Sequence, residues 1–167
     1  MIMNVLFLIG SMLGIFCVIY SMLELYVYLD CVTLRSESPE IYRKKEIATD
    51  VISIFHNIYF IIFGLCIGYF FLSLLVNSIS FNNTMLYATL IASSIDYLAI
   101  AFCEKKFEFS KTKFELREKW NKQKKFDNTV HNAEVEIVKD IERVDKYKIH
   151  SICSLIFIFI ISIVTLV

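Results

Sequence analysis

Residues 104–148 decide the fold. They read EKKFEFSKTKFELREKWNKQKKFDNTVHNAEVEIVKDIERVDKYK, and they separate two segments that are almost wholly apolar. Each charged side chain costs several kcal/mol inside a bilayer, so a run this dense has to stand in water. The apolar segments on either side are long enough to cross a hydrocarbon core of about 30 Å as helices. The pattern therefore predicts that the chain leaves a membrane before residue 104 and returns to it after residue 148.

The composition points the same way. The chain has 167 residues, of which 57% are hydrophobic and 15% aromatic, with a mean hydropathy of +0.61. Ordinary soluble domains are only about 45–50% apolar, so the excess needs lipid to face. The 17 basic and 17 acidic residues cancel. Because no global field attracts polyanions, direct binding of nucleic acid is not expected.

Four apolar segments of membrane-spanning length follow one another along the chain, at residues 3–28, 51–76, 85–103 and 149–167. They predict an all-α polytopic membrane protein with four transmembrane helices. Residues 1–103 then hold the first three spans with a polar connector at 31–50, residues 104–148 form a helical hairpin, and residues 149–167 form span four. A short helix is expected in the connector after Pro39, because proline is favoured at the first helical position.

The positions of lysine and arginine predict the orientation. All 17 lie either in the connector after span one or in the stretch after span three, and with four spans these two segments are on the same side of the membrane. Loops rich in lysine and arginine stay in the cytoplasm. The charged segments are therefore expected in the cytoplasm, and both chain termini outside it.

The charged stretch has internal order. One aromatic series has roughly helical spacing, and a second series recurs every three or four residues, which is typical of an amphipathic helix. The first series is Phe107, Phe114, Trp120 and Phe126; the second is Phe126, Val130, Ala133, Ile137, Ile141 and Val144. Residues 127–129 offer a turn and a helix N-cap between them. Span three is thus expected to continue as a helix to about Lys124, reverse, and return into span four, giving a two-helix stalk about 30 Å long.

Three titratable residues fall inside apolar spans: Glu24, His56 and Asp96. Each lies about 9–12 Å from the charged boundary of its span, so the three can form one polar layer. Such residues usually face a bundle interior and often mark an ion path. In the alternative interpretation, Glu24 and His56 only reach the interface, and Asp96 alone is buried beside Ser93 or Tyr97.

The stalk carries candidate contacts for a cytoplasmic protein partner: Trp120, Lys122, Lys124, Lys125 and Phe126. A solvated helical face is the alternative, because acids interleave with the basic residues elsewhere in the stretch. No Cys/His spacing typical of a metal site and no catalytic motif is present in the sequence. We therefore expect neither an enzyme nor a cofactor or metal, and membrane lipid is the first expected partner.

Four short spans with a helical hairpin drawn from spans three and four resemble the small membrane subunits of bacterial anti-phage defence systems. Among these, the chain most resembles the Kiwa membrane subunit, and the Hailong membrane effector is the second resemblance. The resemblance is one of topology and carries no residue roles. It implies a homo-oligomer, such as a tetramer, whose stalks receive a partner or signal and whose spans sense or permeabilise the bacterial inner membrane. A proton-coupled small transporter and a passive anchor that recruits a cytoplasmic partner are the alternatives.

Overall fold

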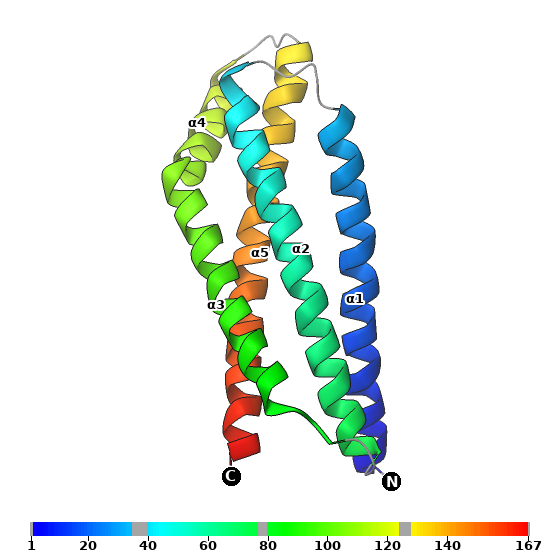
Figure 1. Cartoon of the computed structure of the whole chain (residues 1–167). Helices are drawn as coiled ribbons and strands as arrows, with labels where there is room; N and C mark the ends of the chain where they lie inside the picture. Colours follow the sequence, from blue (N-terminus) through cyan, green and yellow to red (C-terminus); the bar gives the residue numbers. More distant parts are fainter. Residues whose placement is uncertain (1, 35–39, 77–79, 124–127, 167) are drawn as a thin grey trace.

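A computed structural model describes residues 2–34, 40–76, 80–123 and 128–166. Within these ranges it contains five helices and no strand, in agreement with the all-α prediction (Figure 1). They are α1 (Ile2–Leu34), α2 (Glu40–Leu75), α3 (Asn83–Lys106), α4 (Phe109–Lys122) and α5 (Asn128–Leu166). Helices α1, α2, α3 and α5 are long and apolar enough to cross a membrane, over Met3–Leu29, Lys44–Leu75, Asn83–Lys106 and Val130–Ile163.

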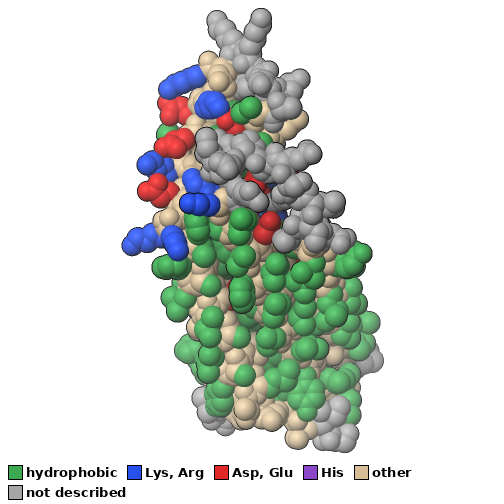
Figure 2. Space-filling model, turned by 45° about the horizontal axis from the view of Figure 1, so that its top comes forward, with side chains coloured by type: hydrophobic (Ala, Val, Ile, Leu, Met, Phe, Trp, Pro, Cys, Tyr) green, Lys and Arg blue, Asp and Glu red, His purple; other side chains and the backbone are tan. Residues whose placement is uncertain are grey.

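The helices form one elongated bundle. Helix α2 packs against α1, α3 and α5, while α4 packs against α5 at one end of the molecule. The first turn of α1 and the last turn of α5 are both at the opposite end of the bundle, apart from each other (Figure 1). Figure 2 shows hydrophobic side chains over that part of the surface, and charged side chains gathered at the end that contains α4. We call residues 44–52, 109–122 and 130–146 the stalk, and residues 3–29, 53–75, 83–106 and 147–163 the membrane half.

The stalk is built from three helices, so the prediction of a two-helix stalk is wrong. Its apolar core combines Ala48 and Ile52 of α2 with residues of α4 and α5, including Leu116 and Ile141, and Ile100 of α3 closes it toward the membrane half. The helix predicted to start after Pro39 does start at Glu40, but it is not short. It continues through the second span as one helix of 36 residues. Its first turns therefore lie beside α4 and α5 and supply the third side of the core.

Span three does not continue as one helix to Lys124. Helix α3 ends at Lys106, and Glu108 takes the left-handed backbone conformation, with φ of 50°. Few residues other than glycine adopt this conformation, so Glu108 marks a definite break in the helix. Helix α4 restarts with Phe109 and Leu116 in the stalk core. Phe114, a member of the predicted aromatic series, is 68% exposed.

Helix α5 agrees with its prediction: the returning arm and span four are one helix of 39 residues. Its buried positions recur every three or four residues along its whole length, which is the spacing of a single helix face. This series runs from Ile137 through Ile141, Val144, Tyr147, Ser151, Ser154 and Ile158 to Ile161, and Glu134, Val138, Asp140 and Ser162 are buried beside it. Val130, at the start of the predicted series, is exposed. The turn and N-cap were predicted at residues 127–129: residue 127 lies outside the described residues, and α5 already begins at Asn128.

Helices α1 and α2 approach each other to backbone contact. All four glycines of the chain are at this crossing: Gly10 and Gly14 in α1, and Gly64 and Gly68 in α2. A Cβ atom added to Gly14 would lie 2.5 Å from the backbone nitrogen of Gly68. The Ser11 hydroxyl donates to the Gly68 carbonyl at 3.3 Å. Each helix carries a GxxxG spacing, which allows close approach of helices in membranes.

Candidate functional site: a polar layer in the membrane half

A buried histidine–aspartate pair forms the centre of the site. Nδ1 of His56 on α2 is hydrogen-bonded to Oδ2 of Asp96 on α3 at 2.8 Å, and the two side chains are only 2% and 5% exposed. Ser151 on α5 donates its hydroxyl to the same carboxylate oxygen. Three helices are therefore joined at one oxygen atom. A carboxylate that accepts hydrogen bonds in this way is satisfied despite its burial.

Aromatic rings hold the imidazole of His56 in place. The ring of Tyr147 stacks on it with centroids 4.2 Å apart, and the Phe60 ring lies 5.2 Å away. His150 lies beside the same group, 6.0 Å from the His56 ring. Tyr147 and His150 both come from α5, so this helix supplies ring contacts as well as the Ser151 hydroxyl. The ring contacts therefore set the orientation of the imidazole plane, and the hydrogen bond to Asp96 sets the position of Nδ1.

Glu24 joins the layer through Tyr147 rather than directly. The Tyr147 hydroxyl donates to Oε2 of Glu24 at 3.1 Å, and Tyr20 donates to the other carboxylate oxygen. One helical turn further along α1, the Tyr28 ring lies under the Arg143 guanidinium, 4.6 Å from its centroid. Such cation–π contacts favour a basic group over an aromatic face. These side chains connect α1 to α5. Within the described residues, the backbones of these two helices are not in contact, because α2 packs against both of them.

A second set of hydrogen bonds lies one turn deeper in the membrane half. The Tyr59 hydroxyl donates to Ser93 at 3.0 Å and is hydrogen-bonded to Ser154. All three side chains are buried. Ser93 therefore pairs with Tyr59, and not with Asp96 as one interpretation of the sequence had it. We define the polar layer as Glu24, His56, Asp96, Tyr147 and Ser151, with this second set directly beneath it.

The three titratable residues predicted from the sequence thus lie in one layer, which also contains residues that the sequence interpretation missed. Tyr147 lies next to the charged boundary of span four, where tyrosine is common at a membrane interface, yet it is 4% exposed and packs in the interior. Its position could have been found by continuing the helical series of α5 beyond Val144, because the next steps fall on Tyr147, Ser151 and Ser154. The depth of the titratable residues along their spans is enough to place them in one layer. Their partners on α5 follow from the helical spacing of that helix's buried face.

The predicted partner-contact residues divide into two groups. Trp120 turns toward the stalk interior, where its indole nitrogen donates to Glu134 at 3.0 Å. Lys122 is exposed and pairs with Glu118 on its own helix. Lys124, Lys125 and Phe126 lie outside the described residues. Trp120 and Glu134 therefore join the two arms of the stalk, whereas Lys122 is open to a partner.

Beyond the polar layer the bundle interior is filled with apolar side chains. Among the described residues this second core consists of Cys66, Ile67, Phe70, Leu86, Ile158 and Ile161. Each of them is under 9% exposed. Among the described residues, the polar layer is thus followed by an apolar core on the side away from the stalk.

These features define an all-α polytopic membrane protein with four membrane-length helices and a charged stalk at one end. A buried polar layer lies between the stalk core and the second apolar core. No protein-family model matches the chain, and neither a curated protein nor a solved structure matches it. Its function is therefore inferred from its geometry.

Proposed function

We propose that this chain is a homo-oligomeric sensor or channel-like effector of the bacterial inner membrane, acting in anti-phage defence. A cytoplasmic protein or signal acts on the stalk, and the change passes to the polar layer in the membrane half. The defence role comes from the resemblance in topology. The coupling is supported by the path of the helices.

The observation that carries the proposal is the continuity of α2 and α5. Each is one uninterrupted helix that contributes to both the stalk core and the polar layer: α2 through Ile52 and His56, and α5 through Val144 and Ser151. The connection from Asp96 on α3 to the stalk helix α4 is instead interrupted at Glu108. A shift of the stalk helices therefore moves His56 and Ser151 relative to Asp96, which stays on α3.

Several copies are needed for any conductance. The interior of one copy is filled by the stalk core, the polar layer and the second apolar core. A pore has to form between copies, or through a rearrangement that opens the polar layer. Asp96 is 6% exposed inside its own bundle, which favours the rearrangement over a pore lined by Asp96 side chains between resting copies. The test therefore has to combine flux with a change in this layer.

The experiment measures ion efflux from liposomes that contain the purified full chain, over a range of pH and membrane potential. In parallel, cells expressing the chain are challenged with a panel of phages. We expect triggered efflux and reduced plaque formation, both lost in Asp96→Asn. The matched control is Asp145→Asn, which makes the same chemical change on a partly exposed stalk carboxylate paired with Lys113. If the wild-type chain gives no efflux under any condition and no change in plaque formation, the effector proposal fails.

Proton-coupled transport is the second candidate, and the His56–Asp96 pair favours it. An imidazole hydrogen-bonded to a carboxylate inside a bilayer is a group on which a proton can be held and exchanged, and such residues recur in proton relays. In this case Asp96→Asn abolishes pH-driven uptake into vesicles measured with an internal pH dye. An Asp96→Asn chain with unchanged uptake excludes this candidate.

A further inference from the structure

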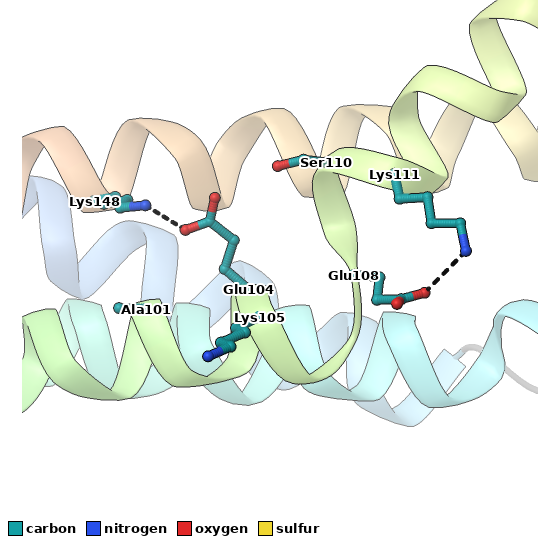
Figure 3. A pocket seen from close by; sticks show the side chains of 7 residues that line it. All are labelled: Ala101, Glu104, Lys105, Glu108, Ser110, Lys111 and Lys148. Atoms are coloured by element: carbon teal, nitrogen blue, oxygen red, sulfur yellow. Dashed lines mark hydrogen bonds and ion pairs between the residues drawn. The ribbon is translucent and has the colours of Figure 1, made fainter.

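The break between α3 and α4 leaves an open cavity of about 460 Å³ against α5. Figure 3 shows side chains of three segments around it: the end of α3, the break with the start of α4, and one lysine of α5. The lining residues are Ala101, Glu104, Lys105, Glu108, Ser110, Lys111 and Lys148. None of them belongs to the polar layer, and the cavity is separate from the site described above.

The charges around the cavity leave a positive excess. Three lysines and two glutamates line it. Lys148 pairs with Glu104, and Lys111 lies 3.6 Å from Glu108, with both of these last side chains more than 60% exposed. Exposed pairs of this kind are weak. Among the described residues Lys105 has no ion-pair partner (Figure 3). The cavity therefore offers the ammonium group of Lys105 to a ligand. It also offers that of Lys111, because its exposed pair with Glu108 is weak.

The cavity lies where the membrane half ends. The membrane-length segment of α3 stops at Lys106, one residue beyond the cavity lysine. On the membrane side of the cavity, α3 exposes Leu98 and Phe102, and α5 exposes Ile149 and Ile152. Apolar residues exposed in this half of the molecule face lipid. A ligand with a charged head in the cavity can thus lay an acyl chain along these side chains without leaving the bilayer.

We propose that the cavity binds the headgroup of an anionic glycerophospholipid of the phosphatidylglycerol type. The ammonium group of Lys105 donates to its phosphodiester oxygens, and Lys111, which lies on the other side of the cavity in Figure 3, adds positive charge to the site. Glu104 and Glu108 accept hydrogen bonds from the hydroxyls of the headgroup glycerol. The single net positive charge of the lining matches the single negative charge of this lipid, and charged partners give the stronger hydrogen bonds. The inference is independent of the proposed function.

The test is lipid retention by the full chain in detergent, measured by native mass spectrometry. Equal amounts of phosphatidylglycerol, phosphatidylethanolamine and phosphatidylcholine are offered together. We expect preferential retention of phosphatidylglycerol. Lys105→Gln should lower this preference about fivefold, the factor expected for one basic residue near an anionic lipid. The double variant with Lys111→Gln should lower it further. Both lysines are on exposed helix ends, so the variants are expected to fold.

The matched control is Lys106→Gln. Lys106 is the next residue of α3 and lies at the same membrane level, but it rests over the rings of Phe102 and Phe107 and does not line the cavity. We expect it to leave the preference unchanged. An equal loss in Lys105→Gln and Lys106→Gln, or equal retention of the three lipids by the wild-type chain, overturns the proposal. Displacement of the lipid by millimolar glycerol 1-phosphate also overturns it, since the site would then be one for a soluble phosphate.

Discussion

The stalk and the membrane half differ in their surfaces and in their buried contacts: both have an apolar core, but the membrane half also buries the polar layer under an apolar surface. In the stalk, residues such as Leu116 and Ile141 are inside, and ion pairs such as Arg117–Glu142 are outside. In the membrane half, the polar layer is inside and the outer surface is apolar. Both arrangements place inside what the surrounding solvent accepts poorly. The difference teaches that the two halves are held together by different forces.

Water drives apolar side chains together in the stalk, because their transfer out of water is favourable. Lipid does not, since its chains are as apolar as leucine. The membrane half must then depend on interhelical hydrogen bonds and on close backbone packing, as at Asp96 and at Gly14. Four sets of substitutions test this comparison.

The largest effect is expected from truncation of the stalk core. Ile141 and Ile158 are both fully buried in α5, one in each half. Ile141→Ala should cost about 2–5 kcal/mol, the usual loss for such a truncation in water. Ile158→Ala should cost only about 1–2 kcal/mol, because in lipid the packing contacts are lost without a transfer term. Local opening free energies from amide hydrogen exchange measure both. Equal losses would contradict the comparison.

The next effect is expected in the polar layer. Asp96→Ala removes the acceptor shared by His56 and Ser151. Interhelical hydrogen bonds in membranes average about 0.6 kcal/mol and reach about 1.7, so two of them predict a loss of about 1–3 kcal/mol in a detergent unfolding titration. Asp96→Asn keeps an acceptor and should lose less. Ser94→Ala is the control on the same helix, because Ser94 bonds only to its own helix at Leu90. An Asp96→Ala chain as stable as wild type would remove the polar layer as a stabilising element.

An effect of similar size is expected at the α1–α2 crossing. Gly14→Ala forces a Cβ atom to within 2.5–2.6 Å of α2 backbone atoms. Overpacking of this kind costs about 1–3 kcal/mol. Gly68→Ala is the matched control, because its Cβ meets nothing closer than 3.6 Å. Hydrogen exchange of α1 peptides should rise in the first variant and stay unchanged in the second. The same rise in both would show that α1 is not held by backbone contact.

The smallest effect is expected on the stalk surface. Arg117 pairs with Glu142 while 54% exposed, and exposed pairs contribute about 0–1 kcal/mol. Arg117→Gln should lower the stalk melting temperature slightly at low salt. The difference should vanish near 1 M salt, where the screening length falls to about 3 Å. A loss that persists at high salt would mean that Arg117 acts through packing.

Much of the fold follows from the sequence because its signals are long. The charged run at residues 104–148 and the apolar segments beside it predict the spans, and the helical series from Ile137 to Val144 predicts the inner face of α5. The depths of His56 and Asp96 place them in one layer, and they are in contact. These signals are averages over many residues, so no single side chain can overturn them.

The remaining features depend on individual contacts. Nothing in the sequence marks Glu108 as left-handed, since neither glycine nor proline is present there. The break follows from tertiary packing, which places Phe109 in the core and leaves Phe114 outside. The third helix of the stalk was missed because the polar composition of residues 40–50 was interpreted as a connector. Tyr147 was missed because a tyrosine near a membrane boundary fits an interfacial belt as well as a packed interior.

The unbroken course of α5 has a mechanical consequence. At 39 residues it is about 58 Å long, and its inner face keeps the same phase from Ile137 to Ile161. A torque applied at the stalk end therefore reaches Ser151 without being absorbed by a hinge. A rotation by one residue, about 100°, would turn the Ser151 hydroxyl away from Asp96 and bring the neighbouring Ile152 toward it. The rotation of α5 about its axis thus determines whether the Asp96 carboxylate keeps the Ser151 hydroxyl as a donor.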